Sequence, residues 1–181
     1  MKNIIFCMVL FSSVLANAEG KFTLTSNLAD GQAIPEDYYG NQFGCTAAGV
    51  SPELKWNNAP EGTKSFAITL YDQDAPTGSG FWHYVLFDIP ANVHQIEVGA
   101  LAKGQIPEGS VESMTDAGKP GYFGPCPPVG SKHTYIYTVH ALKVEKLGVP
   151  PLTSTPAFVG FNLWANLLDK ASFTVTAGPR K

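Results

Sequence analysis

The chain has 181 residues, of which 44% are hydrophobic and 15% are charged, and its formal net charge is -3. This composition excludes a disordered chain, and a mildly acidic charge without a basic run is a poor match for a nucleic-acid-binding protein. The length suits about one domain. With 18 glycines, 14 prolines and 12% aromatic residues, the sequence favours a strand-and-turn protein over a helical bundle.

The N-terminus has the pattern of a cleavable secretory signal. Lys2 is followed by an apolar run that begins at Ile4, and Ala16-Asn17-Ala18 places small residues where a signal peptidase reads them. The run has roughly a dozen residues, fewer than the ~20 that span a bilayer. We therefore predict cleavage after Ala18 and one domain over residues 19–181. The mature protein is then periplasmic or secreted and has no integral membrane segment.

The cysteine count suggests one disulfide. Cys7 lies within the predicted signal, so the mature chain keeps Cys45 and Cys126. An even pair in an oxidising compartment is expected to join, which would close a loop of about 80 residues. The alternative is a pair of free, buried thiols.

In chain order, the strand signals are short and separated by turns. Alternating apolar and polar residues predict a strand at residues 22–26, and short runs bounded by turn residues predict further strands at 54–56, 65–72, 83–89, 135–142 and 173–176. The strand at 83–89 is apolar almost throughout, which predicts burial on both faces. Residues 99–121 are rich in glycine and polar side chains, and we predict a long functional or covering loop there.

One helix is predicted late in the chain. Ser154-Thr155-Pro156 supplies a hydroxyl cap followed by proline in the first turn, which is typical of a helix start. Apolar residues follow at three- and four-residue spacing, and the helix should run to about Lys170. The side chains expected to face the core are Phe158, Phe161, Trp164, Leu167 and Leu168.

Three segments share one form, a strand edge that meets a polar turn. They span residues 70–76, 81–90 and 121–135. If the strands are neighbours, their edges gather polar side chains around one cavity: Asp72, Asp74, His83, Tyr122, His133 and Tyr135. The residues alone also allow a simpler alternative, in which the aspartates satisfy turn amides and the histidines are structural.

Three motifs in these segments occur in a specific order. They are Asp72-Gln73-Asp74-Ala75-Pro76, a strand that begins His83-Tyr84-Val85 and ends Ile89-Pro90, and a glycine- and proline-rich loop at 121–128 followed by His133-Thr134-Tyr135. Together with the Ser-Pro-Glu-Leu segment before Trp56, they resemble the phosphatidylethanolamine-binding proteins, also called Raf kinase inhibitor-like proteins, and their shorter bacterial branch. Gln73 stands where that family usually has proline.

The resemblance implies an antiparallel β-sandwich with a few short helices and a small pocket for an anion, such as a phosphate group or a phospholipid headgroup. The residues it implies are Asp72, His83, His133 and Tyr135 for the pocket lining, Tyr122, Gly124 and Pro125 for the rim, and Asp74 and Pro76 for support of the turn. The expected partner is a small phosphate-bearing or other anionic ligand, without cofactor or metal. A protein partner and a homodimer are compatible with the sequence.

A carboxylate in an anion site has a physical explanation. Asp72 beside an imidazole favours the imidazolium through opposite-charge attraction. A fixed imidazolium, tyrosine hydroxyls and loop N–H groups can then hold an anion. The prolines of the 121–128 loop donate no N–H group and stiffen it, while Gly124 and Cys126 supply amides.

Two other functions stay open from the sequence. One is a hydrolase that uses Cys126 and His133 as thiol and base, or a metal held by Asp72, Asp74, His83 and His133. Neither set has the local spacing of a zinc site or a hydrolase elbow. The other is a secreted protein-binding factor that uses the aromatic side chains of Tyr38, Tyr39 and Phe43.

Overall fold

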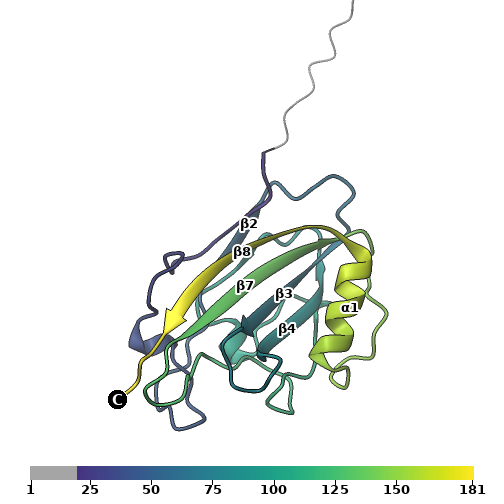
Figure 1. The fold of residues 1–181 in the computed structure, drawn as a ribbon. Helices are drawn as coiled ribbons and strands as arrows, with labels where there is room; N and C mark the ends of the chain where they lie inside the picture. The colour runs from purple at the N-terminus through teal and green to yellow at the C-terminus, as the bar shows by residue number, and fades with distance from the viewer. Residues whose placement is uncertain (1–19) are drawn as a thin grey trace, which may run out of the picture.

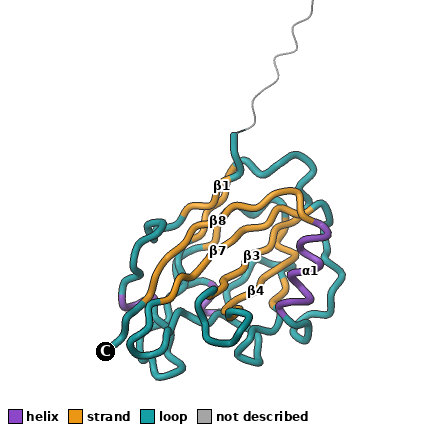
Figure 2. The backbone as a smooth tube through the Cα atoms, viewed as in Figure 1, coloured by secondary structure: helices purple, strands orange, loops and turns teal. Residues whose placement is uncertain are grey.

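The computed structural model describes residues 20–181, and the predicted signal sequence, residues 1–18, lies outside them. In Figure 1 and Figure 2 the long strands lie side by side and one helix covers one end of them. The strands are β1 (Thr23–Thr25), β2 (Leu54–Asn57), β3 (Ser65–Asp72), β4 (Phe81–Pro90), β5 (Gln95–Ile96), β6 (Val111–Glu112), β7 (His133–Leu142) and β8 (Leu167–Ala177). The helix α1 spans Pro156–Asn166, and two 3-10 turns span Glu36–Tyr38 and Leu101–Lys103.

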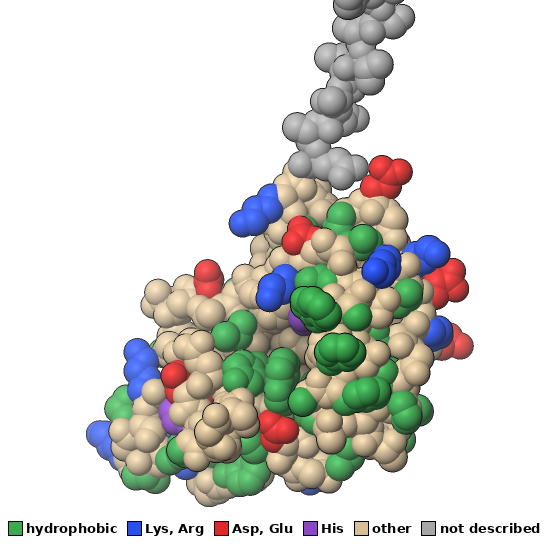
Figure 3. All heavy atoms as spheres, turned by 45° about the vertical axis from the view of Figure 1, so that its right-hand side comes forward, with side chains coloured by type: hydrophobic (Ala, Val, Ile, Leu, Met, Phe, Trp, Pro, Cys, Tyr) green, Lys and Arg blue, Asp and Glu red, His purple; other side chains and the backbone are tan. Residues whose placement is uncertain are grey.

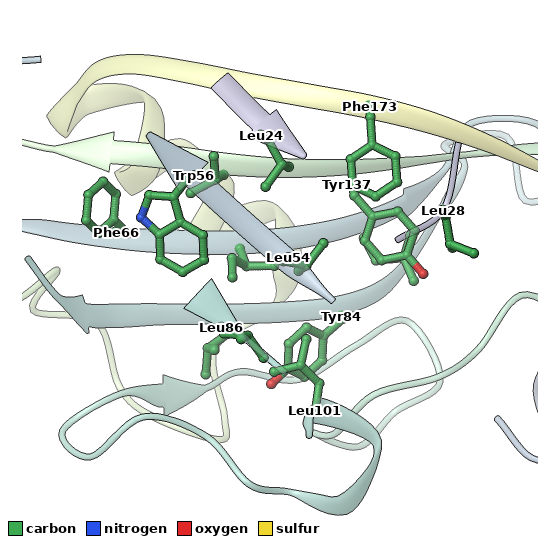
Figure 4. Packing of buried hydrophobic residues seen from close by; sticks show 14 of the residues in the cluster. Leu24, Leu28, Leu54, Trp56, Phe66, Tyr84, Leu86, Leu101, Tyr137 and Phe173 are labelled. Carbon is green, nitrogen blue, oxygen red and sulfur yellow. The ribbon is translucent and has the colours of Figure 1, made fainter. Parts of the chain in front are cut away.

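The strands form two antiparallel sheets, a small one in the order β1-β2-β5 and a large one in the order β6-β4-β3-β7-β8. The main hydrophobic core combines side chains of both sheets, including Trp56 from β2, Phe66 from β3 and Tyr137 from β7, all of which are fully buried (Figure 4). Two sheets that share one core make a β-sandwich. The predicted fold class is therefore confirmed.

The central strands agree well with the sequence prediction. β3 begins and ends at the predicted residues, and β4 is buried from His83 to Ile89. In β4, Tyr84 and Leu86 face the main core, while Val85 and Phe87 join a second cluster under α1. Burial on both faces explains why this strand is apolar without alternation.

The prediction for the face of α1 that meets the core is wrong. The helix does begin after Thr155, whose side-chain oxygen accepts from the Phe158 N–H group at 3.3 Å. It buries Val159 and Leu163 in the second cluster, whereas the predicted core residues are exposed, Phe161 by 63% and Trp164 by 72% of their surface. Phe158 and Leu168 are exposed as well, and Leu167 is partly buried. Both faces of this helix are apolar, so the spacing of apolar residues does not select the buried one.

The helix is also shorter than predicted. It ends at Asn166, and β8 begins at the next residue and pairs with β7 from end to end. Leu167 and Leu168 therefore belong to a strand, because the hydrogen bonds offered by the edge of β7 outweigh the helical pattern. The predicted loop at 99–121 contains the Leu101–Lys103 turn and β6, which pairs with β4.

Candidate functional site

Three strand ends meet at one end of the large sheet. Asp72, the last residue of β3, pairs with Phe81, the first residue of β4, and with Tyr135 of β7. His133 begins β7 and pairs with Ala177 near the end of β8. The antiparallel register therefore brings together residues that are far apart in the chain, at the end of the sheet away from α1.

A buried carboxylate lies between two buried imidazoles at this point. The Oδ2 atom of Asp72 is 2.7 Å from Nδ1 of His133 and 3.9 Å from Nε2 of His83. The other carboxylate oxygen, Oδ1, accepts from the Asp74 N–H group at 2.9 Å. All three side chains are almost fully buried, so their mutual orientation is fixed by packing.

The hydrogen bonds indicate which ring nitrogen of each histidine carries a proton. Nδ1 of His83 lies 3.1 Å from the Phe123 carbonyl oxygen, which can only accept, so this nitrogen donates and carries a proton. Nδ1 of His133 donates to the Asp72 carboxylate. The remaining nitrogen of His133, Nε2, is therefore the ring atom that is left for a ligand.

Asp72 is held in its ionised form. Burial on its own would raise the pKa of this carboxyl group, but the nearby His83 ring and the hydrogen bonds from His133 and the Asp74 N–H group together outweigh burial, so the pKa is lowered. Tyr135 lies beside this carboxylate with its ring 5.3 Å from that of His83, and its buried hydroxyl has no hydrogen-bond partner among residues 20–181. Burial, followed by the nearby Asp72 charge, raises the pKa of Tyr135 well above its ordinary value.

The two imidazoles and the carboxylate line a cavity of about 300 Å³. This volume suits a small ligand. Besides Asp72, His83 and His133, the lining comprises Phe43, Ala75, Pro76, Thr77, Phe81, Cys126, Pro128 and Arg180.

Sequence reasoning did not place Arg180, Phe81 or Phe43 in the cavity. The Arg180 side chain donates to the Pro127 carbonyl from Nε at 2.6 Å and to the Gly44 carbonyl at 3.1 Å. Its backbone continues from β8 and accepts from the Gly130 N–H group at 2.9 Å. Arg180 thus connects the two loops that border the cavity and adds a positive charge beside them.

The same two loops are joined covalently. Cys45 and Cys126 form a disulfide, with their Cα atoms 6.0 Å apart. The predicted pairing is therefore present, and the sulfur of Cys126 is not a free thiol. A thiol nucleophile at Cys126 with His133 as its base is incompatible with this bond.

Comparisons with known proteins agree with this architecture. The family model "Phosphatidylethanolamine-binding protein" matches residues 25–178. The chain belongs to the phosphatidylethanolamine-binding protein family. It is 41% identical to the UPF0098 protein YbcL of Escherichia coli over 178 residues, covering 96% of this chain and 97% of YbcL. The crystal structure of YbcL superposes with a TM-score of 0.82 over 87% of this chain and 98% of that one.

Two further relatives extend the comparison within this family. The UPF0098 protein YbhB of Escherichia coli is 42% identical over 83% of this chain and 96% of YbhB. A protein of Mycobacterium tuberculosis that carries the name lipoprotein LppC is 36% identical over 75% of this chain and 62% of its own length.

Most of the family's glycine- and proline-rich loop, residues 121–128, lies outside the lining of this cavity, to which it contributes Cys126 and Pro128. The Tyr122 hydroxyl is hydrogen-bonded to the Tyr137 hydroxyl at 2.7 Å, which turns this side chain into the sandwich. A Cβ atom on Gly124 would lie 2.9 Å from the Gly40 nitrogen, so only glycine fits there. The Pro125 carbonyl accepts from the Gly40 N–H group at 2.9 Å. Tyr122 and Gly124 line a separate cavity of about 340 Å³.

The aspartate turn is tied to the neighbouring strand. Oδ2 of Asp74 accepts from the Thr134 N–H group at 2.7 Å, and Pro76 lies in the cavity wall. Asp74 therefore fixes the position of the strand that carries His133. Among residues 20–181, no three His, Cys, Asp or Glu side chains are grouped as a metal site would require. The same residues contain no helix of the length and hydrophobicity needed to cross a bilayer.

Proposed function

We propose that this protein binds a small anionic, phosphate-bearing ligand in the cavity formed around Asp72 and His133, and that it acts as a binding or modulator protein. The observation that carries the proposal is the pair of imidazoles held by one buried carboxylate in a cavity of about 300 Å³. The name of the family refers to a ligand of this class, a phospholipid with a phosphate-bearing headgroup.

The cavity offers an anion a hydrogen-bond donor on His133 and a positive charge on Arg180. Asp72 is held in its ionised form and accepts a hydrogen bond from Nδ1 of His133 at 2.7 Å. An imidazolium donates from both ring nitrogens, so Nε2 can donate to a phosphate oxygen while Nδ1 stays on Asp72. The guanidinium group of Arg180 supplies a further positive charge at the cavity wall.

We further propose an extracytoplasmic location. The signal pattern over residues 1–18, the Cys45–Cys126 disulfide and the relative that is named a lipoprotein support it. In such a compartment the ligand would be a phosphorylated small molecule or an accessible lipid headgroup.

Titration calorimetry with inorganic phosphate and with phosphoethanolamine tests the proposal. Loss of one charge-assisted hydrogen bond costs about 1.5–3 kcal/mol, so His133→Ala should weaken binding by about tenfold to a hundredfold. Asp72→Ala should weaken it as well, because His133 loses the hydrogen bond that orients its ring. His94→Gln is the matched control, since His94 is exposed and outside the cavity, and it should bind like the wild type.

Thermal melts of each variant are needed beside the titrations, so that a folding defect is not mistaken for lost affinity. Binding curves of folded His133→Ala and Asp72→Ala protein that superpose on the wild-type curve would refute the proposal.

A further inference from the structure

The exposed side of α1 carries an aromatic ridge, which we define as Phe158, Phe161 and Trp164. The three side chains are exposed by 50%, 63% and 72%, and the rings of Phe161 and Trp164 lie 6.0 Å apart. Spaced three residues apart, they lie on the side of the helix opposite to Val159 and Leu163. Leu152 before the helix and Leu168 after it are exposed by 52% and 40% and extend the apolar surface at both ends.

The segment of chain that carries this surface has no charged residue. No Asp, Glu, Lys or Arg occurs between Lys146 and Asp169, and α1 has no charged residue in its first or last turn. The two asparagines of the helix donate to its own carbonyl oxygens, Asn162 to Phe158 at 2.8 Å and Asn166 to Asn162 at 3.0 Å. The ridge therefore offers almost no directional hydrogen bonds, of which a typical protein–protein interface has about ten.

Two lysines lie beside the C-terminal end of the ridge. The Lys143 N–H group donates to the Asn166 carbonyl, and Lys170 pairs with His140 on the face of the large sheet that α1 covers. Neither lysine forms an ion pair within residues 20–181. Asp169 projects toward the opposite face, because neighbouring strand residues alternate. Figure 3 shows hydrophobic side chains gathered on this side, with Lys or Arg and Asp or Glu side chains both present along its margin.

We propose that the aromatic ridge docks on the surface of a lipid bilayer that contains anionic lipids. Phe and Trp are suited to the boundary between headgroups and acyl chains, where an apolar ring is buried and the indole N–H group of Trp164 can remain hydrated. Lys143 and Lys170 then reach the anionic headgroups. The net charge of -3 gives no long-range attraction, so the lysines beside the ridge supply it locally.

The docking surface and the ligand cavity lie at opposite ends of the large sheet. Ala67, near the start of β3, packs in the cluster under α1, while Asp72 ends the same strand in the cavity. The whole of β3 spans about 23 Å. A bilayer on the ridge therefore leaves the cavity open, and the two sites can be tested independently.

Flotation of the full-length mature protein with vesicles tests the inference. We expect binding to mixed phosphatidylcholine–phosphatidylglycerol vesicles and much weaker binding to pure phosphatidylcholine. Phe161→Ser/Trp164→Ser should reduce the affinity by about twentyfold or more while phosphate binding stays at the wild-type level. Phe43→Ser is the matched control, because Phe43 is exposed by 60% but lies at the cavity, and it should float like the wild type.

Variants of the two lysines provide a second, independent test. Each of Lys143→Gln and Lys170→Gln should lower the affinity for the anionic vesicles by about fivefold, and added salt should reproduce this loss in the wild type. Sedimentation velocity on the same proteins detects the competing occupant, a second copy of the chain.

Three outcomes would overturn the inference. The first is a ridge variant that floats as well as the wild type, and the second is flotation that Phe43→Ser abolishes. The third is a wild-type dimer that Phe161→Ser/Trp164→Ser converts to monomer, because the ridge would then be a subunit interface.

Discussion

Removal of the Cys45–Cys126 disulfide should destabilise the protein mainly through its unfolded state. The two residues are 81 positions apart, and the entropy of closing a loop of that length corresponds to about 4.5 kcal/mol at 25 °C. This is a large part of the 5–15 kcal/mol that keeps a typical domain folded. The double variant Cys45→Ala/Cys126→Ala leaves no free thiol among residues 20–181 and isolates the effect.

The folded state should change little, because other contacts hold the same loops. The Gly40 N–H group donates to the Pro125 carbonyl at 2.9 Å, and Arg180 donates to the Pro127 and Gly44 carbonyls at 2.6 and 3.1 Å. We therefore expect phosphate affinity to fall by less than about threefold, since these bonds still position the cavity wall.

Urea unfolding followed by tryptophan fluorescence measures the change. The variant should lose about 4.5 kcal/mol, with a larger m-value because its unfolded chain is less compact. A loss below about 1 kcal/mol would refute the chain-entropy reasoning. A similar loss with an unchanged m-value and abolished phosphate binding would show that the bond acts by ordering the folded loops instead.

Three further outcomes follow from the packing and the charges. Leu163→Ala should lower the free energy of unfolding by about 2–4 kcal/mol and Phe161→Ala by less than about 1 kcal/mol. A larger loss for Phe161→Ala in urea unfolding would contradict the assignment of Leu163 to the buried face of α1. Burial, followed by the charge of Lys170, lowers the pKa of His140 to about 4. The unfolded chain therefore gains a proton at higher pH than the folded protein does, stability should fall between pH 6.5 and about 4, and His140→Gln should flatten that part of the stability–pH curve. The lowered pKa of Asp72 acts in the same direction at lower pH: its contribution is present above the ordinary aspartate pKa of 3.8 and is lost as pH falls through the folded value, so Asp72→Asn should remove part of the acid destabilisation seen by circular dichroism.

The strands that were predicted well are those whose ends carry local signals. β3 alternates and ends in an aspartate turn, and β4 is stopped by Pro90, so both boundaries can be read from nearby residues. The start of β8 has no such signal. Leu167 and Leu168 continue the spacing of α1, and only pairing with β7, which lies some 25 residues earlier, assigns them to a strand.

The polar centre of the site was predictable because its members lie at strand ends, where antiparallel neighbours meet. Asp72, His83 and His133 fall into this class. Arg180 does not, because its place depends on contacts with Pro127 and Gly44, at separations of 53 and 136 residues. The direction of Tyr122 could not be predicted either, since only the partner hydroxyl on β7 decides whether the ring faces the cavity or the sandwich.

The most direct test of the proposed ligand site is a phosphate titration followed by NMR of the imidazole nitrogens. The chain has four histidines, of which His83 and His133 line the cavity while His94 and His140 lie outside it. We predict saturable shifts of the His83 and His133 signals with one common Kd and stationary signals for the other two. Equal movement of all four, or movement confined to His94 and His140, would contradict an anion site between Asp72, His83 and His133.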